Sequence, residues 1–277
     1  MTRRRAFDVT IAGATALALT FLLLPLVAIF LRVPLGDFVS QLGSGVAVDA
    51  LVVTLETNAI AQALILLVGT PTAYFIATKQ FRGRAVAITL VELPLVLPPA
   101  VAGLALLAAF GRLGLLGSTF DVLGVTVSTG TKTAVILAVA YVASPFYVRG
   151  AIASFESLDQ PLLDASRTLG AGPARTFARI ALPLAAKGLG AAAALSFARG
   201  IGEFGATIMF AGSLQGVTQT LSLAIYAQFD LDPDVALSLG ALLVVVCAAI
   251  LFTVKLLPAW TRSSSTSVYP FAPSGSS

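Results

Sequence analysis

The sequence predicts an all-α polytopic membrane protein with six transmembrane helices. Of its 277 residues, 57% are hydrophobic and only 11% are charged, whereas an ordinary soluble domain is about a quarter charged. The mean hydropathy is +0.96, and several apolar runs exceed the ~18 residues that suffice to cross a hydrocarbon core. Lipid, rather than water, is therefore the solvent for most of this chain.

Six apolar segments supply the predicted spans. The first follows Arg3, Arg4 and Arg5 and has no small-residue cleavage site behind it, which favours an uncleaved span over a signal peptide. The second and fifth are longer than a bilayer requires, so we expect them to tilt or to project from it. The spans cover about residues 9–31, 50–77, 85–110, 133–148, 182–211 and 235–257.

Prolines interrupt the third predicted span. Pro94, Pro98 and Pro99 each remove a backbone donor and bend a helix. Beside Gly103 they suit a bend that lines a pore, and a simple packing kink is the alternative that the sequence leaves open.

The basic residues predict the orientation, because they concentrate in short cytoplasmic loops. With the N-terminus inside, only Arg32, Arg112 and Lys132 fall outside. Thirteen fall inside, so both termini and the loop at 156–183 are predicted to be cytoplasmic. The thirteen are Arg3, Arg4, Arg5, Lys79, Arg82, Arg84, Arg149, Arg167, Arg175, Arg179, Lys187, Lys255 and Arg262.

The predicted organisation is one membrane domain, residues 9–258, between a cytoplasmic tail at 1–8 and a Ser- and Pro-rich, disordered tail at 259–277. Histidine is absent and Cys247 is the single cysteine, which removes the commonest metal ligand and any disulfide framework. The sequence contains no phosphate-binding P-loop. The charge of +4 does not indicate nucleic acid, because the basic residues flank the spans.

A polar, arginine-bearing loop separates the fourth and fifth spans. A short helix is predicted from Pro161, with Asp159 as a possible N-cap, and Gly170 and Gly172 end it. Pro173 suits the first position of a second helix. An ordered loop of this kind is typical of a docking surface.

The fifth segment carries charge at membrane depth. Arg199 and Glu203 are four residues apart, so they share a helix face and can pair. Gly202, Gly205 and the intervening Phe204 suit a constriction that opens and closes. A structural ion pair that fixes a dimer interface is the alternative.

The loop resembles the "EAA" loop of ABC-importer permeases, in which coupling helices sit in a cleft of a cytoplasmic ATPase. Asp164 and Ala165 match the first two signature positions, and Gly170 matches the turn, with residues 180–183 (IALP) at the expected spacing. Asp replaces the usual Glu, and Ser166 replaces a second Ala. A helix resting on lipid headgroups is the competing interpretation. The resemblance implies ATPase-coupling roles for Asp164, Ala165, Ser166, Arg167, Gly170, Ala171 and Arg175.

Further segments narrow this resemblance. Residues 196–212, 220–226, 93–103 and 111–114 resemble molybdate, tungstate and sulfate permeases. The resemblance implies the type I ABC importer permease fold, a homodimer, a cytoplasmic ATPase dimer and an external oxyanion-binding protein. It also implies a path or gate that contains Arg199, Gly202, Glu203, Phe204, Gly205, Thr207, Pro98 and Pro99.

The function implied is ATP-driven import of molybdate or tungstate across the cell membrane. The chain itself would hold no cofactor, because ATP and Mg would bind to the partner ATPase. Sulfate or thiosulfate import is the alternative within the family. A secondary transporter driven by ions and an intramembrane enzyme using Glu203 or Asp164 are the alternatives from other classes. The absence of histidine and of metal-ligand spacing argues against the enzyme.

Overall fold

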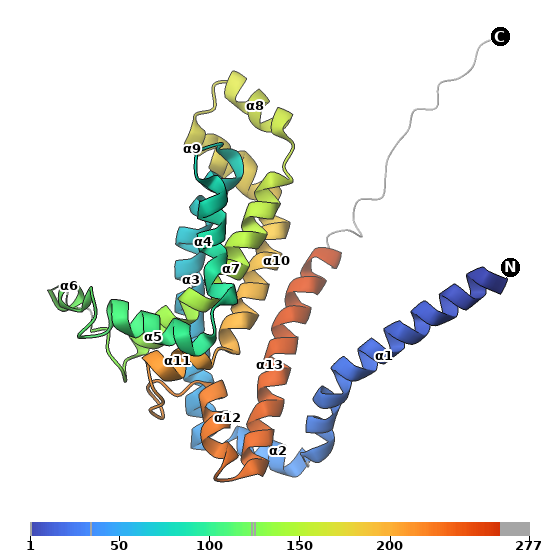
Figure 1. Ribbon diagram of the computed structural model, residues 1–277, viewed down its shortest axis with the longest axis vertical. Coiled ribbons are helices and arrows are strands. Elements are labelled where there is room, and N and C mark those ends of the chain that lie inside the picture. The colour runs from blue at the N-terminus through green and yellow to red at the C-terminus, as the bar shows by residue number, and fades with distance from the viewer. Residues whose placement is uncertain (1, 34, 123, 125, 261–277) are drawn as a thin grey trace.

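Three long helices lie side by side and form the centre of the protein: α3 (Gly45–Thr78), α7 (Lys132–Glu156) and α10 (Leu182–Ile201). The computed structural model describes residues 2–33, 35–122, 124 and 126–260 (Figure 1). The other helices are α1 (Thr2–Arg32), α2 (Leu35–Leu42), α4 (Arg84–Val96), α5 (Pro99–Phe110), α6 (Gly117–Val122), α8 (Gln160–Thr168), α9 (Pro173–Thr176), the π-helical turn η1 (Phe177–Ala181), α11 (Gly205–Phe210), α12 (Leu221–Phe229) and α13 (Pro233–Trp260).

Small residues let the three central helices approach closely. A Cβ added at Gly150 of α7 would lie 2.6 Å from Ala192 Cβ of α10, and one added at Gly188 would lie 2.2 Å from Ser154 Oγ. Where lipid surrounds a bundle, such close contact is a main source of helix association. At one end of this core, Tyr74 packs against Phe155 and Phe177, with ring centroids 5.2 and 4.8 Å away.

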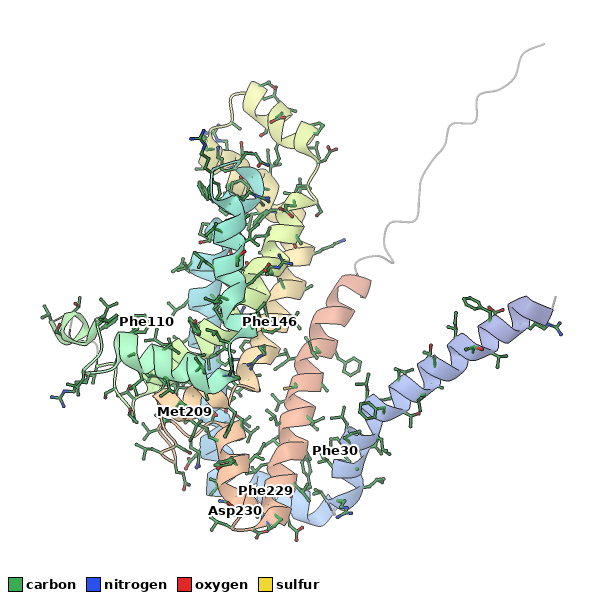
Figure 2. All side chains as sticks on the ribbon, in the orientation of Figure 1. Phe30, Phe110, Phe146, Met209, Phe229 and Asp230 are labelled. Carbon is green, nitrogen blue, oxygen red and sulfur yellow. The ribbon has the colours of Figure 1, made fainter. Side chains whose placement is uncertain are left out.

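The prediction of six spans is confirmed. Among the described residues, five helices are long and apolar enough to cross a membrane, and the bent pair α4 and α5 makes the sixth. In Figure 1, α13 packs against α10 and α12, whereas α1 diverges from the rest of the molecule. Phe30, labelled in Figure 2, lies on this exposed helix, at 44% exposure.

The third span is broken at its prolines, as predicted, and it forms two separate helices that meet at an angle of 114°. The break has a direct cause. In a helix the N–H groups of residues 98 and 99 would bond to the carbonyls of Pro94 and Leu95, and proline has no N–H at either position. The last bond of α4 is therefore Leu97 N–H to the Leu93 carbonyl, at 3.2 Å.

The prediction for the end of the fifth span, at residue 211, is wrong. Helix α10 ends at Ile201, residues 202–204 leave the helix, and α11 begins at Gly205. Glycine at 202 and 205 was the available signal in an otherwise apolar run. The fourth span is longer than predicted, because α7 continues past Val148 to Glu156.

Helices α5 and α11 pack against each other across the core (Figure 1). A Cβ at Gly103 of α5 would lie 2.7 Å from both the Ala206 carbonyl oxygen and Met209 Cβ, and one at Gly205 would lie 2.5 Å from Pro99 Cβ. These two glycines therefore permit the contact between the two broken segments.

We predict that Gly103→Ala lowers the thermal unfolding midpoint in detergent. The added Cβ overlaps the α11 backbone, and overpacking of this kind lowers the free energy of unfolding by about 1–3 kcal/mol. Gly190→Ala is the matched control, because Gly190 is also helical and a Cβ there meets nothing within 4 Å. In that control the midpoint should stay the same or rise, because alanine in a helix is up to about 1 kcal/mol more favourable than glycine. Equal midpoints for both variants would show that the α5–α11 contact is loose.

Candidate translocation path and coupling loop

Arg199 and Glu203 form an ion pair at the break between α10 and α11. Arg199 Nη2 lies 2.7 Å from Glu203 Oε2, as their spacing predicted, although that oxygen is not aligned for a hydrogen bond. The Glu203 side chain is 1% exposed and that of Arg199 is 29% exposed. A charge at membrane depth costs several kcal/mol unless it is paired or hydrated, so each stabilises the other.

Glu203 also has a structural task that the sequence did not indicate. Its Oε1 accepts a hydrogen bond from Ala206 N–H at 2.7 Å, in the first turn of α11. Its carbonyl accepts a hydrogen bond from Ser222 Oγ of α12 at 2.6 Å. Glu203 therefore holds the irregular segment in place while it neutralises Arg199.

Polar residues of α3 hold the neighbouring elements. Asn58 Nδ2 donates to the Phe197 carbonyl of α10 at 2.9 Å, and Thr54 Oγ1 accepts from Leu221 N–H at 2.8 Å. Gly200 gives Asn58 room, because a Cβ there would lie 2.1 Å from Asn58 Oδ1. Sequence analysis missed Asn58 and Thr54, whose signal was their polar character inside a long apolar span.

The predicted path residues divide into two groups. Arg199 and Pro99 line one small cavity, while Pro98 lies at the adjoining break. Gly202 caps α10, Phe204 packs against Tyr226 with ring centroids 5.1 Å apart, and Gly205 contacts Pro99.

The hydroxyl groups of Thr207 and Ser196 in the fifth span are both buried. Thr207 is fully buried, and its hydroxyl has no partner among the described residues. Ser196 Oγ donates to the Ala143 carbonyl at 2.9 Å, so it is occupied in helix packing. Glu92, close to the proline break, pairs with Arg149 of α7.

The loop at residues 156–183, for which the coupling role is predicted, folds as two helices around a glycine turn. Asp159 stands immediately before α8, and Pro173 is the first residue of α9, as predicted. Gly170 has φ +85°, a left-handed conformation that residues with a Cβ resist. The Ala171 N–H then bonds to the Ser166 carbonyl at 3.0 Å, which closes the end of α8.

Within this loop, Ser166 faces inward and other residues face outward. Ser166 Oγ lies 3.1 Å from Thr176 Oγ1, and both side chains are buried, so α8 is fastened to α9. Ala171 is half-buried, whereas Asp164, Ala165 and Arg175 are exposed. The Arg167 side chain lies outside the described part of the chain. Leu169, which sequence analysis did not select, is 88% exposed beside the turn.

The path from loop to core is continuous. Helix α9, the π-helical turn η1 and α10 form one helical run, Pro173–Ile201. The turn carries Phe177, which packs on Tyr74 and Phe155. Force applied to α8 and α9 therefore reaches α3 and α7 through packed side chains.

We predict that Arg199→Gln destabilises the protein and that Arg199→Gln with Glu203→Gln restores part of the loss. The single variant leaves Glu203 buried and uncompensated, at a cost of up to about 3 kcal/mol, near the low end for buried pairs because Arg199 is partly exposed. Lys132→Gln is the control, because the Lys132–Glu56 pair is 40% and 44% exposed and contributes less than about 1 kcal/mol. Thermal unfolding of the three variants measures this, and a double variant less stable than the single one would contradict it.

Comparison with known proteins identifies the family to which this chain belongs. Residues 65–262 match the family described as binding-protein-dependent transport system inner membrane component. The chain is 42% identical over 238 residues to the molybdenum transport system permease protein ModB of Mycobacterium tuberculosis, covering 85% of this chain and 89% of that protein. It is 34% identical over 243 residues to the probable transport system permease protein NifC of Clostridium pasteurianum, a match that covers 87% of this chain and 85% of that protein.

The fold has solved counterparts. A crystal structure of a bacterial alginate ABC transporter, in complex with an alginate pentasaccharide-bound periplasmic protein, contains a chain that superimposes with a TM-score of 0.74. The match covers 96% of this chain and 98% of that one at 18% identity, so it speaks for the fold alone. On the family match and on the two relatives, the chain belongs to the family of inner membrane components of binding-protein-dependent transport systems.

Proposed function

We propose that this chain is the permease subunit of an ATP-driven importer of molybdate, and that two copies form the translocation path. The observation that carries the cargo assignment is the 42% identity with a molybdenum permease across 85% of the chain. The chain is a multi-pass inner membrane protein with both termini in the cytoplasm. ATP hydrolysis takes place in a separate ATPase, which binds the nucleotide and its metal.

The loop formed by α8 and α9 is the docking site for that ATPase. Exposed Asp164 and Arg175 present charged groups, and Ala165 and Leu169 add apolar side chains that a cleft can cover. The Gly170 turn and the Ser166–Thr176 contact keep the two helices in one arrangement. A rigid surface of this kind transmits a displacement, whereas a flexible loop would absorb it.

The proposed transport cycle has four steps. A loaded binding protein docks outside, and ATP draws the two ATPase subunits together inside. That closure moves α8 and, through Pro173–Ile201, shifts the break at residues 202–204. The facing segments of the two copies then part for the anion, and hydrolysis restores the inward-facing state.

Tungstate shares the tetrahedral shape and charge of molybdate and is expected to follow the same route. Sulfate is the second candidate cargo, because the binding protein supplies most of the specificity. Uptake of labelled molybdate, tungstate and sulfate by cells that lack the chromosomal locus and carry the reconstituted transporter separates these cargoes. We expect molybdate uptake that requires the ATPase and survives collapse of the ion gradient. Uptake that fails only when the gradient is dissipated would instead establish a secondary transporter.

Substitution of Gly170 by valine tests the docking surface. A β-branched residue resists φ +85° by about 1–2 kcal/mol, so α8 reorients and the ATPase affinity falls by about 5–30-fold. The control is Gly83→Val, because Gly83 lies in another predicted cytoplasmic loop at φ +92° and a Cβ meets nothing within 4 Å at either site.

Co-purification of the ATPase with each variant measures this effect. The Gly83 variant should retain the partner and the Gly170 variant should lose it, while both remain in the membrane. Equal retention would remove α8 from the docking surface.

A further inference from the structure

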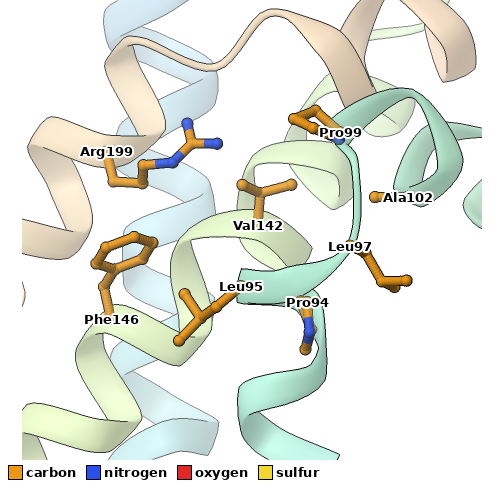
Figure 3. A pocket seen from close by; sticks show the side chains of 8 residues that line it. All are labelled: Pro94, Leu95, Leu97, Pro99, Ala102, Val142, Phe146 and Arg199. Carbon is orange, nitrogen blue, oxygen red and sulfur yellow. The ribbon is translucent and has the colours of Figure 1, made fainter.

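A small cavity lies where the proline break meets the end of α10. Its volume is about 120 Å³, and one water molecule requires only about 10–15 Å³, so it has room for several waters or for one small anion. Figure 3 shows Arg199 on one side and Pro99 and Ala102 on the other. One cation and seven apolar residues line it: Arg199, Pro94, Leu95, Leu97, Pro99, Ala102, Val142 and Phe146.

Arg199 lines the cavity, but its ion-pair partner Glu203 does not. Arg199 contributes to the wall, whereas Glu203 is 1% exposed and does not. Arginine has five N–H donors. Within the described part of the chain, Glu203 is the one side chain paired with this guanidinium, so donors remain for the cavity.

The first turn of α5 borders the same cavity. Pro99 and Ala102 belong to the first turn of the 12-residue helix α5. The amides of Ala100 and Val101 in that turn have no acceptor within the helix, and a helix N-terminus carries a partial positive charge. The start of α5 beside the cavity therefore adds a partial positive charge to the full charge of Arg199.

We infer that this cavity is a transient binding site for the transported tetrahedral oxyanion, with Arg199 as its principal contact. The inference rests on the proposed function, because it assigns the cargo to a specific place on the path. A guanidinium suits an oxyanion, since its planar donors can bind two oxygens at once.

Glu203 sets the strength of this site. A carboxylate 2.7 Å behind the guanidinium reduces its attraction for a dianion. Conduction requires a site that attracts the cargo and also releases it. A neutralised arginine meets both demands, whereas an isolated one would retain the anion. The competing explanation is that Arg199 serves only to neutralise Glu203.

The charge that Arg199 presents to the cavity can be measured directly. Cys247 is the single cysteine, so Cys247→Ser with Leu97→Cys places one reactive thiol on the wall. The complete transporter in nanodiscs is treated with two methanethiosulfonate reagents, one bearing a sulfonate and the other an ammonium group. The ratio of their reaction rates reports the local potential.

We expect the sulfonate reagent to react faster, with a rate ratio that falls at least about tenfold in the Arg199→Gln, Glu203→Gln double variant. Lysine at 199 should preserve the ratio and Glu203→Gln alone should raise it. Free molybdate should slow the reaction unless Arg199 is neutralised. Leu113→Cys, fully exposed on an outer loop, is the control whose ratio should not change.

The outcomes separate this inference from the proposed function. Molybdate uptake by the transporter that retains Leu97, combined with a rate ratio that does not depend on Arg199, would overturn the site and leave the function standing. A ratio that depends on Arg199, with protection by sulfate and uptake of sulfate alone, would support the site and overturn the molybdate assignment. A lower ratio of sulfonate to ammonium reaction rates with lysine at position 199 would also overturn the site. The positive charge would then be present without accelerating the sulfonate reagent.

Discussion

A polypeptide that leaves its helix within a membrane must satisfy its backbone polar groups from the protein or from trapped water. This constraint shapes the centre of the molecule. The chain breaks at residues 97–98 and again at 202–204, and the segments that follow, α5 and α11, pack against each other. Glu203 provides the acceptor for one freed amide, and Ser222 donates to the Glu203 carbonyl. The ion pair with Arg199 offsets the free-energy cost of burying this carboxylate at membrane depth.

Ion pairs and hydrogen bonds join the helices at the end of the molecule that carries α8 and α9, the end predicted to be cytoplasmic. Arg84 at the start of α4 pairs with Glu156 of α7 and donates from Nε to the Ile76 carbonyl of α3 at 2.8 Å. Arg149 of α7 pairs with Glu92 of α4. Together with the Phe177 contacts, these interactions join the loop helices to three spans. The broken segments α5 and α11 lie away from this end, at the proposed translocation path.

Much of this architecture follows from sequence because lipid imposes a strong pattern. Apolar run length located the spans, and the spacing of Arg199 and Glu203 predicted their pairing. Gly170 and Pro173 located the turn between the loop helices. The end of the fifth span was misplaced because residues 206–211 are as apolar as a helix core, so hydropathy cannot register the break. The contacts of Asn58 and Thr54 depend on which helices become neighbours, and a single sequence does not state that. The cavity likewise arises only when the two breaks meet.

The proposed mechanism requires a separate ATPase to bind the loop formed by α8 and α9. Its most direct test is a single cysteine at position 165, an exposed residue of α8, in a Cys247→Ser background, treated with a short crosslinker in native membranes. The account predicts a crosslink to the ATPase whose yield changes with bound nucleotide. Labelling of that cysteine only by impermeant reagents added outside intact cells would contradict it.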